Sequence, residues 1–256
     1  MRIALATLIL LATPAVAEAK LHREAVAYNQ GGQALEGYLV YDEAQAGKRP
    51  GVMVVHEWWG LNAYVKRRAD QLAGLGYVAF AADMYGKGKV ATTRDQAKQY
   101  ASALYGDNAL WRARAKAGWE QLVKRPQVDP ARLAAMGYCF GGGTALELAR
   151  TGTPMAGVVT FHGSLGTPHP EASQIKGKVL VLHGADDANL KDLPAFQAEM
   201  RQHHTNYQLN LYGGAVHAFS NPEAGNDPSK GAAYDAQADK RSWDAMGAFF
   251  REVFGQ

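Results

Sequence analysis

One pentapeptide of this chain has the residue types of a nucleophile held in a sharp turn: Gly137-Tyr138-Cys139-Phe140-Gly141. The apolar run 132–136 precedes it, and the small-residue run 142–150 follows it. This order predicts a strand, a tight turn and a helix, with Cys139 at the apex. The glycines permit a close approach of strand and helix, and the helix N-terminus favours a thiolate. A nucleophile elbow with cysteine in place of serine is one interpretation, and a buried cysteine without a chemical role is the other.

An aspartate and a histidine that follow later in the chain have the residue types and the order needed to activate such a thiol. Asp187 follows the apolar run 179–184, and His217 lies in the loop after the run 207–212. The carboxyl ends of parallel strands meet at one edge of a sheet, so we expect both residues to lie near Cys139. Taken singly, Asp187 also fits the cap of a helix that starts near residue 190, and His217 fits an exposed surface histidine.

Together the three residues predict nucleophilic catalysis. His217 would take the proton of Cys139 or hold its thiolate as an ion pair, and Asp187 would fix the imidazole tautomer. The thiolate would attack an ester or lactone carbonyl, and water activated by His217 would release the acyl group. The backbone N–H groups of Phe140 and Trp58 are the expected oxyanion donors, because they follow the nucleophile and an earlier strand, respectively.

The first residues predict export. Arg2 and the apolar run 3–11 precede Ala15-Val16-Ala17, which fits a signal-peptide cleavage site. We therefore expect residues 1–17 to be removed and the protein to be periplasmic or secreted. The apolar run is too short to span a bilayer comfortably, so no membrane association is expected after cleavage. A formal net charge of +3, without a basic stripe, argues against a nucleic-acid partner. The partner expected from the chemistry is a small-molecule ester or lactone, and the protein is expected to be a monomer.

Residues 18–256 are predicted to form one domain in which strands alternate with helices. The segments 24–28 and 35–41 flank a turn, which predicts an N-terminal β-hairpin. The further strands are expected at 51–55, 77–82, 132–138, 156–161, 179–184 and 207–212, and the helices at 64–75, 93–105, 108–124, 142–150 and 232–253. This alternation predicts a mostly parallel central sheet with helices on both faces.

Several sequence blocks together resemble the dienelactone hydrolase family, and the resemblance extends from about residue 35 to residue 254. The blocks are Val54-Val55-His56-Glu57-Trp58-Trp59-Gly60-Leu61-Asn62, Ala82-Asp83-Met84-Tyr85-Gly86, Gly137-Tyr138-Cys139-Phe140-Gly141-Gly142, His183-Gly184-Ala185-Asp186-Asp187 and His217-Ala218-Phe219. The resemblance implies an α/β-hydrolase fold, no cofactor, and carboxymethylenebutenolidase-type ester hydrolysis by a Cys-Asp-His triad.

The resemblance also implies a catalytic role for Glu57, whose counterpart interacts with the nucleophile and helps to generate the thiolate. From the residues alone, Glu57 fits equally well as a carboxylate near the start of the following helix. The neighbouring His56 is interpreted as structural. No metal site is expected there, because an H-E-x-x-H site needs a second histidine where Gly60 stands.

The chain departs from the family pattern at the two arginines that hold a substrate carboxylate. Lys87 and Asn221 stand at those positions. A lysine attracts a carboxylate as a point charge but lacks the planar fork of arginine, so the triad is better supported than a dienelactone substrate. The residues expected to line an apolar acyl site are Trp58, Trp59, Tyr85 and Phe219.

Two other classes of function compete with a hydrolase. A non-catalytic binding protein could retain this fold, but the complete set of triad residues argues against this interpretation. A thiol-based peroxide sensor could use Cys139, but the chain holds a single cysteine and thus no resolving partner. The order of the three triad residues favours the hydrolase.

Overall fold

The computed structural model describes residues 19–256, so the signal peptide expected at 1–17 lies outside the described residues. The strands are β1 (Leu21–Gln30), β2 (Gln33–Asp42), β3 (Arg49–Val55), β4 (Val78–Ala82), β5 (Val128–Tyr138), β6 (Gly157–Phe161), β7 (Lys178–Gly184) and β8 (Tyr207–Tyr212). The helices are α1 (Ala63–Gly74), α2 (Arg94–Tyr105), α3 (Asn108–Val123), α4 (Phe140–Arg150), α5 (Leu193–Gln202) and α6 (Ala236–Phe254). No helix within this range is both long and apolar enough to cross a membrane.

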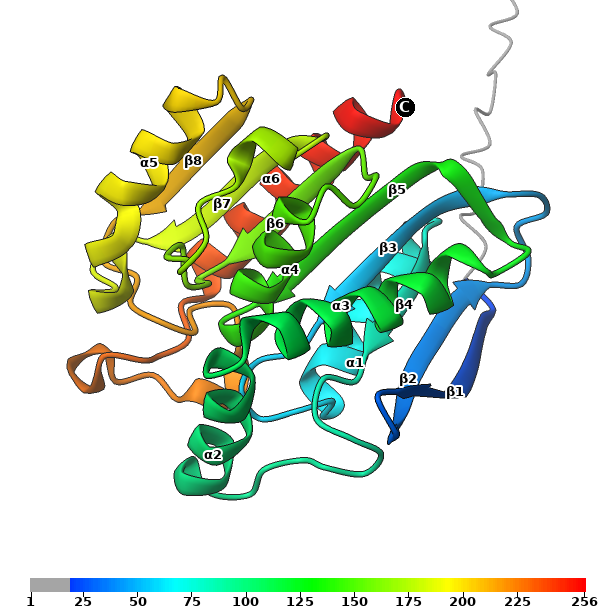
Figure 1. The fold of residues 1–256 in the computed structure, drawn as a ribbon, viewed down its shortest axis with the longest axis horizontal. Coiled ribbons are helices and arrows are strands. Elements are labelled where there is room, and N and C mark those ends of the chain that lie inside the picture. The colour runs from blue at the N-terminus through cyan, green and yellow to red at the C-terminus, as the bar shows by residue number, and fades with distance from the viewer. Residues whose placement is uncertain (1–18) are drawn as a thin grey trace, which may run out of the picture.

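The strands form one eight-stranded sheet in the order β1-β2-β4-β3-β5-β6-β7-β8 (Figure 1). The hairpin of β1 and β2 joins β4 in antiparallel fashion, and all pairs from β4 to β8 are parallel. Strands β3, β4 and β6 are buried along their whole length, as their continuous apolar sequences predict. The predicted hairpin and mostly parallel sheet are thereby confirmed.

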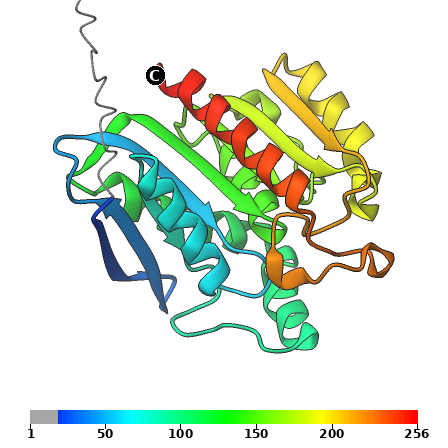
Figure 2. The same cartoon turned by 180° about the vertical axis from the view of Figure 1, so that it is seen from behind.

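Helices cover both faces of the sheet, as predicted. Figure 2 shows α1 and α6 on one face, where their side chains form an apolar cluster that includes Leu72 and Phe250. Helices α2, α3, α4 and α5 lie on the other face of the sheet (Figure 1). The apolar cluster on that face includes Trp111, Leu146 and Met200. The sheet is therefore held between two apolar layers, which leaves its carboxyl edge as the place where loops meet.

Among the boundaries that differ from the sequence prediction, three have a clear local cause. Strand β5 begins at Val128, four residues before the expected start, because it already pairs there with Arg49 ahead of a shift in register. Helix α6 begins at Ala236, since the carboxylate of Asp235 accepts hydrogen bonds from the first turn and fixes the start. The helix expected near residue 190 is a short 3-10 helix, Ala188–Asp192, that continues into α5.

Candidate active site

Cys139 lies at the junction of β5 and α4, at the apex of the predicted turn. Its backbone has φ 54° and ψ −117°, a left-handed conformation that non-glycine residues rarely adopt. The two glycines of the pentapeptide permit this turn by close packing. A Cβ atom on Gly137 would lie 2.1 Å from the carbonyl oxygen of Gly141, and a Cβ atom on Gly141 would lie 2.2 Å from that of Val55. The sequence therefore forces the cysteine to project from the carboxyl edge of the sheet.

The structure brings Cys139, His217 and Asp187 together in one chain of contacts. His217 Nε2 lies 3.1 Å from Cys139 Sγ, and His217 Nδ1 lies 2.8 Å from Asp187 Oδ2. Burial lowers the pKa of His217, but the charges of Cys139 and Asp187 outweigh burial and raise this pKa well above its usual value. The geometry therefore favours the charged imidazolium form of His217, between the sulfur of Cys139 and the carboxylate of Asp187.

The carboxylate of Asp187 has two further contacts besides His217. Its Oδ1 accepts a hydrogen bond from the N–H of Asn189 at 2.9 Å, so the capping role expected as an alternative is also present. His183 Nε2 lies 3.1 Å from the same Oδ2 that contacts His217. Burial raises the pKa of Asp187, but its close contacts with His183 and His217 hold it below the usual range. The carboxylate therefore remains charged.

A buried histidine that sequence reasoning left without a role supports the ring of His217. His162 follows β6, and its ring centroid lies 5.1 Å from that of His217 in an edge-to-face arrangement. His162 Nε2 lies 2.8 Å from the hydroxyl oxygen of Ser220, which also contacts the hydroxyl of Tyr64. With φ at 40°, His162 holds a strained backbone. Its place at a strand end was the only sequence signal for it.

Two of the described residues that line the cavity of the thiol have backbone N–H groups without a protein acceptor. Phe140 is the first residue of α4, and Trp58 follows β3; both residues line the same cavity as Cys139. Within the described part of the chain, neither N–H donates a hydrogen bond to another protein group. A helix N-terminus leaves such donors free for an anion. These are the two donors predicted from the sequence.

A cavity of about 940 Å³ opens over Cys139 and His217. Of the predicted site residues, it is lined by Cys139, Asp187, His217, Glu57, Trp58, Phe140 and Trp59. Tyr105, at the end of α2, adds an aromatic wall that the sequence analysis did not identify. Its ring lies edge-on to Phe140, at a centroid distance of 5.5 Å. The cavity therefore combines the reactive groups with an aromatic surface.

Three predicted substrate-binding residues do not line this cavity, which corrects the sequence analysis. Lys87 is 60% exposed and forms an ion pair with Glu36 of β2, at 2.7 Å. Tyr85 is buried and its hydroxyl donates to the carbonyl of Trp58, so it supports the loop from behind. Phe219 is fully buried and packs edge-on against His162. Each side chain is directed into other packing by contacts that lie far away in the sequence.

Glu57 is buried at the cavity wall, with 3% of its surface exposed. Its Oε2 accepts a hydrogen bond from Asn221 Nδ2 at 2.7 Å. Burial raises the pKa of Glu57 to about 7, against the smaller opposing effects of Asn221 and His217. His56 is structural, as interpreted: its Nε2 accepts from the N–H of Met84 at 3.2 Å. Across residues 19–256, no group of three or more His, Cys, Asp or Glu side chains is arranged to hold a metal ion.

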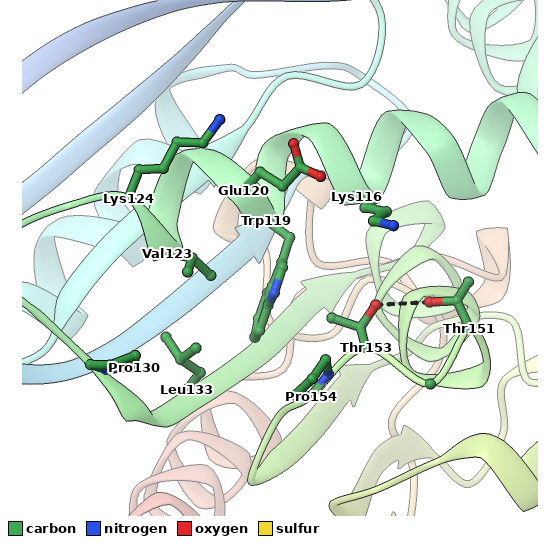
Figure 3. Close-up of a pocket in the computed structure, with 11 residues that line it drawn as sticks. Lys116, Trp119, Glu120, Val123, Lys124, Pro130, Leu133, Thr151, Thr153 and Pro154 are labelled. Atoms are coloured by element: carbon green, nitrogen blue, oxygen red, sulfur yellow. Dashed lines mark hydrogen bonds between the residues drawn. The ribbon is translucent and has the colours of Figure 1, made fainter.

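A second cavity, of about 530 Å³, lies at the opposite end of β5. Trp119 of α3, Leu133 of β5 and Pro154 form its apolar walls (Figure 3). The hydroxyls of Thr151 and Thr153 bond to each other at 2.8 Å on one side of it. It contains none of the reactive groups described above, so the chemistry is concentrated at the first cavity.

Comparison with known proteins agrees with this geometry. The model of the dienelactone hydrolase family matches residues 35–254. The chain belongs to this family. It is therefore a hydrolase of the α/β-hydrolase fold, as the elbow, the sheet order and the position of the reactive groups also indicate.

Individual relatives cover most of the chain. The solved structure of a dienelactone hydrolase-like promiscuous phosphotriesterase from metagenomic libraries is 43% identical, with a TM-score of 0.87, and the match covers 91% of this chain and 99% of the other. A protein of Saccharolobus solfataricus with the provisional name carboxymethylenebutenolidase is 25% identical, over 88% of this chain and 97% of its own length. A Bradyrhizobium protein with the provisional name 2-oxo-3-(5-oxofuran-2-ylidene)propanoate lactonase is 31% identical, over 68% of this chain and 74% of its own.

Proposed function

We propose that the protein hydrolyses ester or lactone bonds through a Cys139–His217–Asp187 triad and a thioester acyl-enzyme. The observation that carries this proposal is the continuous contact from Sγ through the imidazole to a buried carboxylate, at 3.1 and 2.8 Å. The provisional names of the Saccharolobus and Bradyrhizobium relatives, a butenolidase and a lactonase, favour the same bond type.

In the first half of the reaction, the thiolate of Cys139 attacks the carbonyl carbon and forms the C–S bond. The carbonyl electron pair moves onto oxygen, where the N–H groups of Phe140 and Trp58 donate hydrogen bonds to the oxyanion. The oxyanion then collapses, the C–O bond to the leaving group breaks, and His217 gives its Nε2 proton to the departing oxygen. An ester releases an alcohol at this step, whereas a lactone opens and keeps its hydroxyl group.

In the second half, water resolves the thioester. His217 Nε2 accepts a proton from a water molecule, whose oxygen attacks the acyl carbon. The C–S bond then breaks, the carboxylic acid leaves, and the thiolate regains its partner imidazolium. Asp187 keeps the Nδ1 proton of His217 in place throughout, so the same nitrogen serves both halves of the reaction.

The test is turnover and acyl-enzyme capture in the protein without residues 1–17. We expect hydrolysis of p-nitrophenyl butyrate, and an acid-quenched intact mass raised by one acyl group on the single cysteine. Cys139→Ala and His217→Ala should each lower kcat by at least about 10³-fold, as removal of a triad member does elsewhere. His169→Gln is the matched control, because that histidine is exposed and outside the cavity.

Other outcomes of this test would contradict the proposal or favour another function. Activity that persists in Cys139→Ala would overturn the proposal. Ligand binding in the cavity without turnover would favour the binding protein considered above, and oxidation of Cys139 by peroxide without turnover would favour the sensor.

A second candidate is hydrolysis of neutral aryl phosphotriesters by the same thiolate. It is favoured by the name of the 43% identical protein, a promiscuous phosphotriesterase, because the match covers 99% of that protein. Attack of Cys139 at phosphorus would form an S–P bond and displace the aryloxide, and water would then break the S–P bond of the S-phosphorylated cysteine to release a dialkyl phosphate and the thiolate. The same variants test this second candidate with diethyl p-nitrophenyl phosphate as the substrate. Equal rates of hydrolysis by the wild type and Cys139→Ala would rule out the thiolate as the nucleophile in this reaction.

We also propose that the protein is exported after cleavage behind Ala17 and acts as a monomer. The basic start, apolar run and small-residue site of the sequence support export. The intact mass of the exported protein should equal that of a chain that starts at Glu18. Light scattering should give the molar mass of a single chain. Retention of residues 1–17, or twice the expected mass, would contradict the respective part.

A further inference from the structure

The cavity that contains Cys139 is also lined by the carboxylate of Glu57, and a neutral amide holds that carboxylate. Asn221 is 4% exposed and caps the 3-10 helix Pro222–Ala224. Its Oδ1 accepts the N–H of Glu223 at 2.9 Å. Because this contact requires the oxygen, the NH₂ group must be the end that meets Glu57, at 2.7 Å. Asn221 therefore supplies a hydrogen bond to Glu57 but no positive charge.

Among the described residues, the one cation in the interior of this cavity is His217, which already contacts Asp187 and Cys139 and offsets Glu57 only in part. The other cations among its described lining residues are Arg94, Lys191 and Lys230, and all three are exposed. The buried Arg68 lowers the pKa of Glu57 only weakly, because its guanidinium is paired with Asp239 and donates to the carbonyl of Ser220.

Another part of the cavity lining is aromatic. It consists of Trp58, Trp59, Tyr105 and Phe140. The rings of Trp58 and Trp59 meet edge to face at 5.2 Å. Such a wall binds an aryl or alkyl acyl group by burial of apolar surface. None of these four side chains carries a positive charge for a carboxylate.

We propose that the site selects uncharged esters or lactones with an apolar or aryl acyl group and rejects acyl groups that carry a carboxylate. Glu57, oriented by Asn221, is the specificity-determining residue. This inference rests on the proposed hydrolase function and adds the substrate class to it. The physical basis is repulsion between two negative charges at a site where water screens them poorly.

The test compares two esters that differ in charge and almost nothing else: p-nitrophenyl 4-carbamoylbenzoate and p-nitrophenyl 4-carboxybenzoate. They share the leaving group, and the para position keeps the carboxylate from attacking its own ester. Each kcat/KM at pH 8 is divided by the rate constant of the same ester with hydroxide, which removes the electronic difference. The selectivity is the ratio of the two normalised values.

We expect the wild-type enzyme to prefer the carbamoyl ester by at least about tenfold, which corresponds to 1.4 kcal/mol. In Glu57→Gln the preference should fall to within about twofold, whatever happens to the absolute rates. Lys87→Ala is the matched control, since Lys87 is paired with Glu36 outside the cavity, and it should keep the wild-type preference.

Three results would overturn the inference. The first is equal or better use of the carboxylate ester by the wild type. The second is an unchanged preference in Glu57→Gln. The third is a selective loss of carboxylate-ester turnover in Arg94→Ala or Lys191→Ala, which would show that the exposed cations bind the anion. Absence of Cys139-dependent turnover with both esters would instead overturn the proposed hydrolase function itself, and the inference with it.

Discussion

Replacing Glu57 by glutamine should make the protein more stable at alkaline pH and leave it nearly unchanged at acidic pH. Burial raises the pKa of this carboxyl from its usual 4.5 to about 7. Between these two values the folded protein binds a proton that the unfolded chain has released. The contribution of Glu57 to stability is therefore fully present below pH 4.5 and is lost as the pH rises through 7.

The size of this effect follows from the difference between the two pKa values. At 1.36 kcal/mol for each pKa unit, the difference between 4.5 and about 7 corresponds to about 3 kcal/mol. The side chain is 3% exposed, so solvent screens little of this cost. Glutamine is never ionised, and its Oε1 can still accept the hydrogen bond from Asn221.

The assay is urea denaturation of wild type and Glu57→Gln from pH 4.5 to pH 9. The free energy of unfolding of the variant minus that of the wild type should rise by about 3 kcal/mol over this range and level off above pH 8. All other titrating groups are common to both proteins and cancel in the difference. A difference that stays constant with pH, or that falls, would refute the burial argument.

Three further changes test how the site is held. His183→Asn removes a contact to Asp187 without touching the cavity, so kcat should fall about tenfold with KM nearly unchanged; a change in KM alone would speak against this positioning role. Gly141→Ala places a Cβ atom 2.2 Å from the carbonyl oxygen of Val55 and should cost about 3 kcal/mol in urea denaturation; wild-type stability would contradict the close packing. Ser220→Ala removes the polar contact of His162 and should lower the free energy of unfolding by about 1 kcal/mol, which the same denaturation measures.

Much of the reactive centre could be predicted because its signals are local. The glycines around Cys139 indicate the elbow, because a Cβ atom on Gly137 would clash within the turn itself and one on Gly141 would clash with the neighbouring strand β3. Asp187 and His217 each follow a strand, and parallel strands share a carboxyl edge, so their meeting required only the order of the elements. The backbone donors at Phe140 and Trp58 follow from the same rule.

Side-chain direction at the cavity wall could not be predicted in this way. Lys87 lies next to the Asp-x-Tyr block in sequence, yet its direction is set by Glu36 on a strand that joins the sheet in antiparallel fashion. Tyr85 and Phe219 have the right residue types for an acyl site, but packing against Trp58 and His162 turns them inward.

The sequence by itself determined the sharp turn at Cys139, the meeting of Cys139 with Asp187 and His217, and the layered sheet, because periodicity, turn chemistry and chain order act over short distances. Only the tertiary structure decided which charges face the substrate. The contact of Asn221 with Glu57 joins residues 164 positions apart, and that of His183 with Asp187 depends on two side chains rotating toward one buried space. Such contacts arise from packing of the whole domain, which no local pattern encodes.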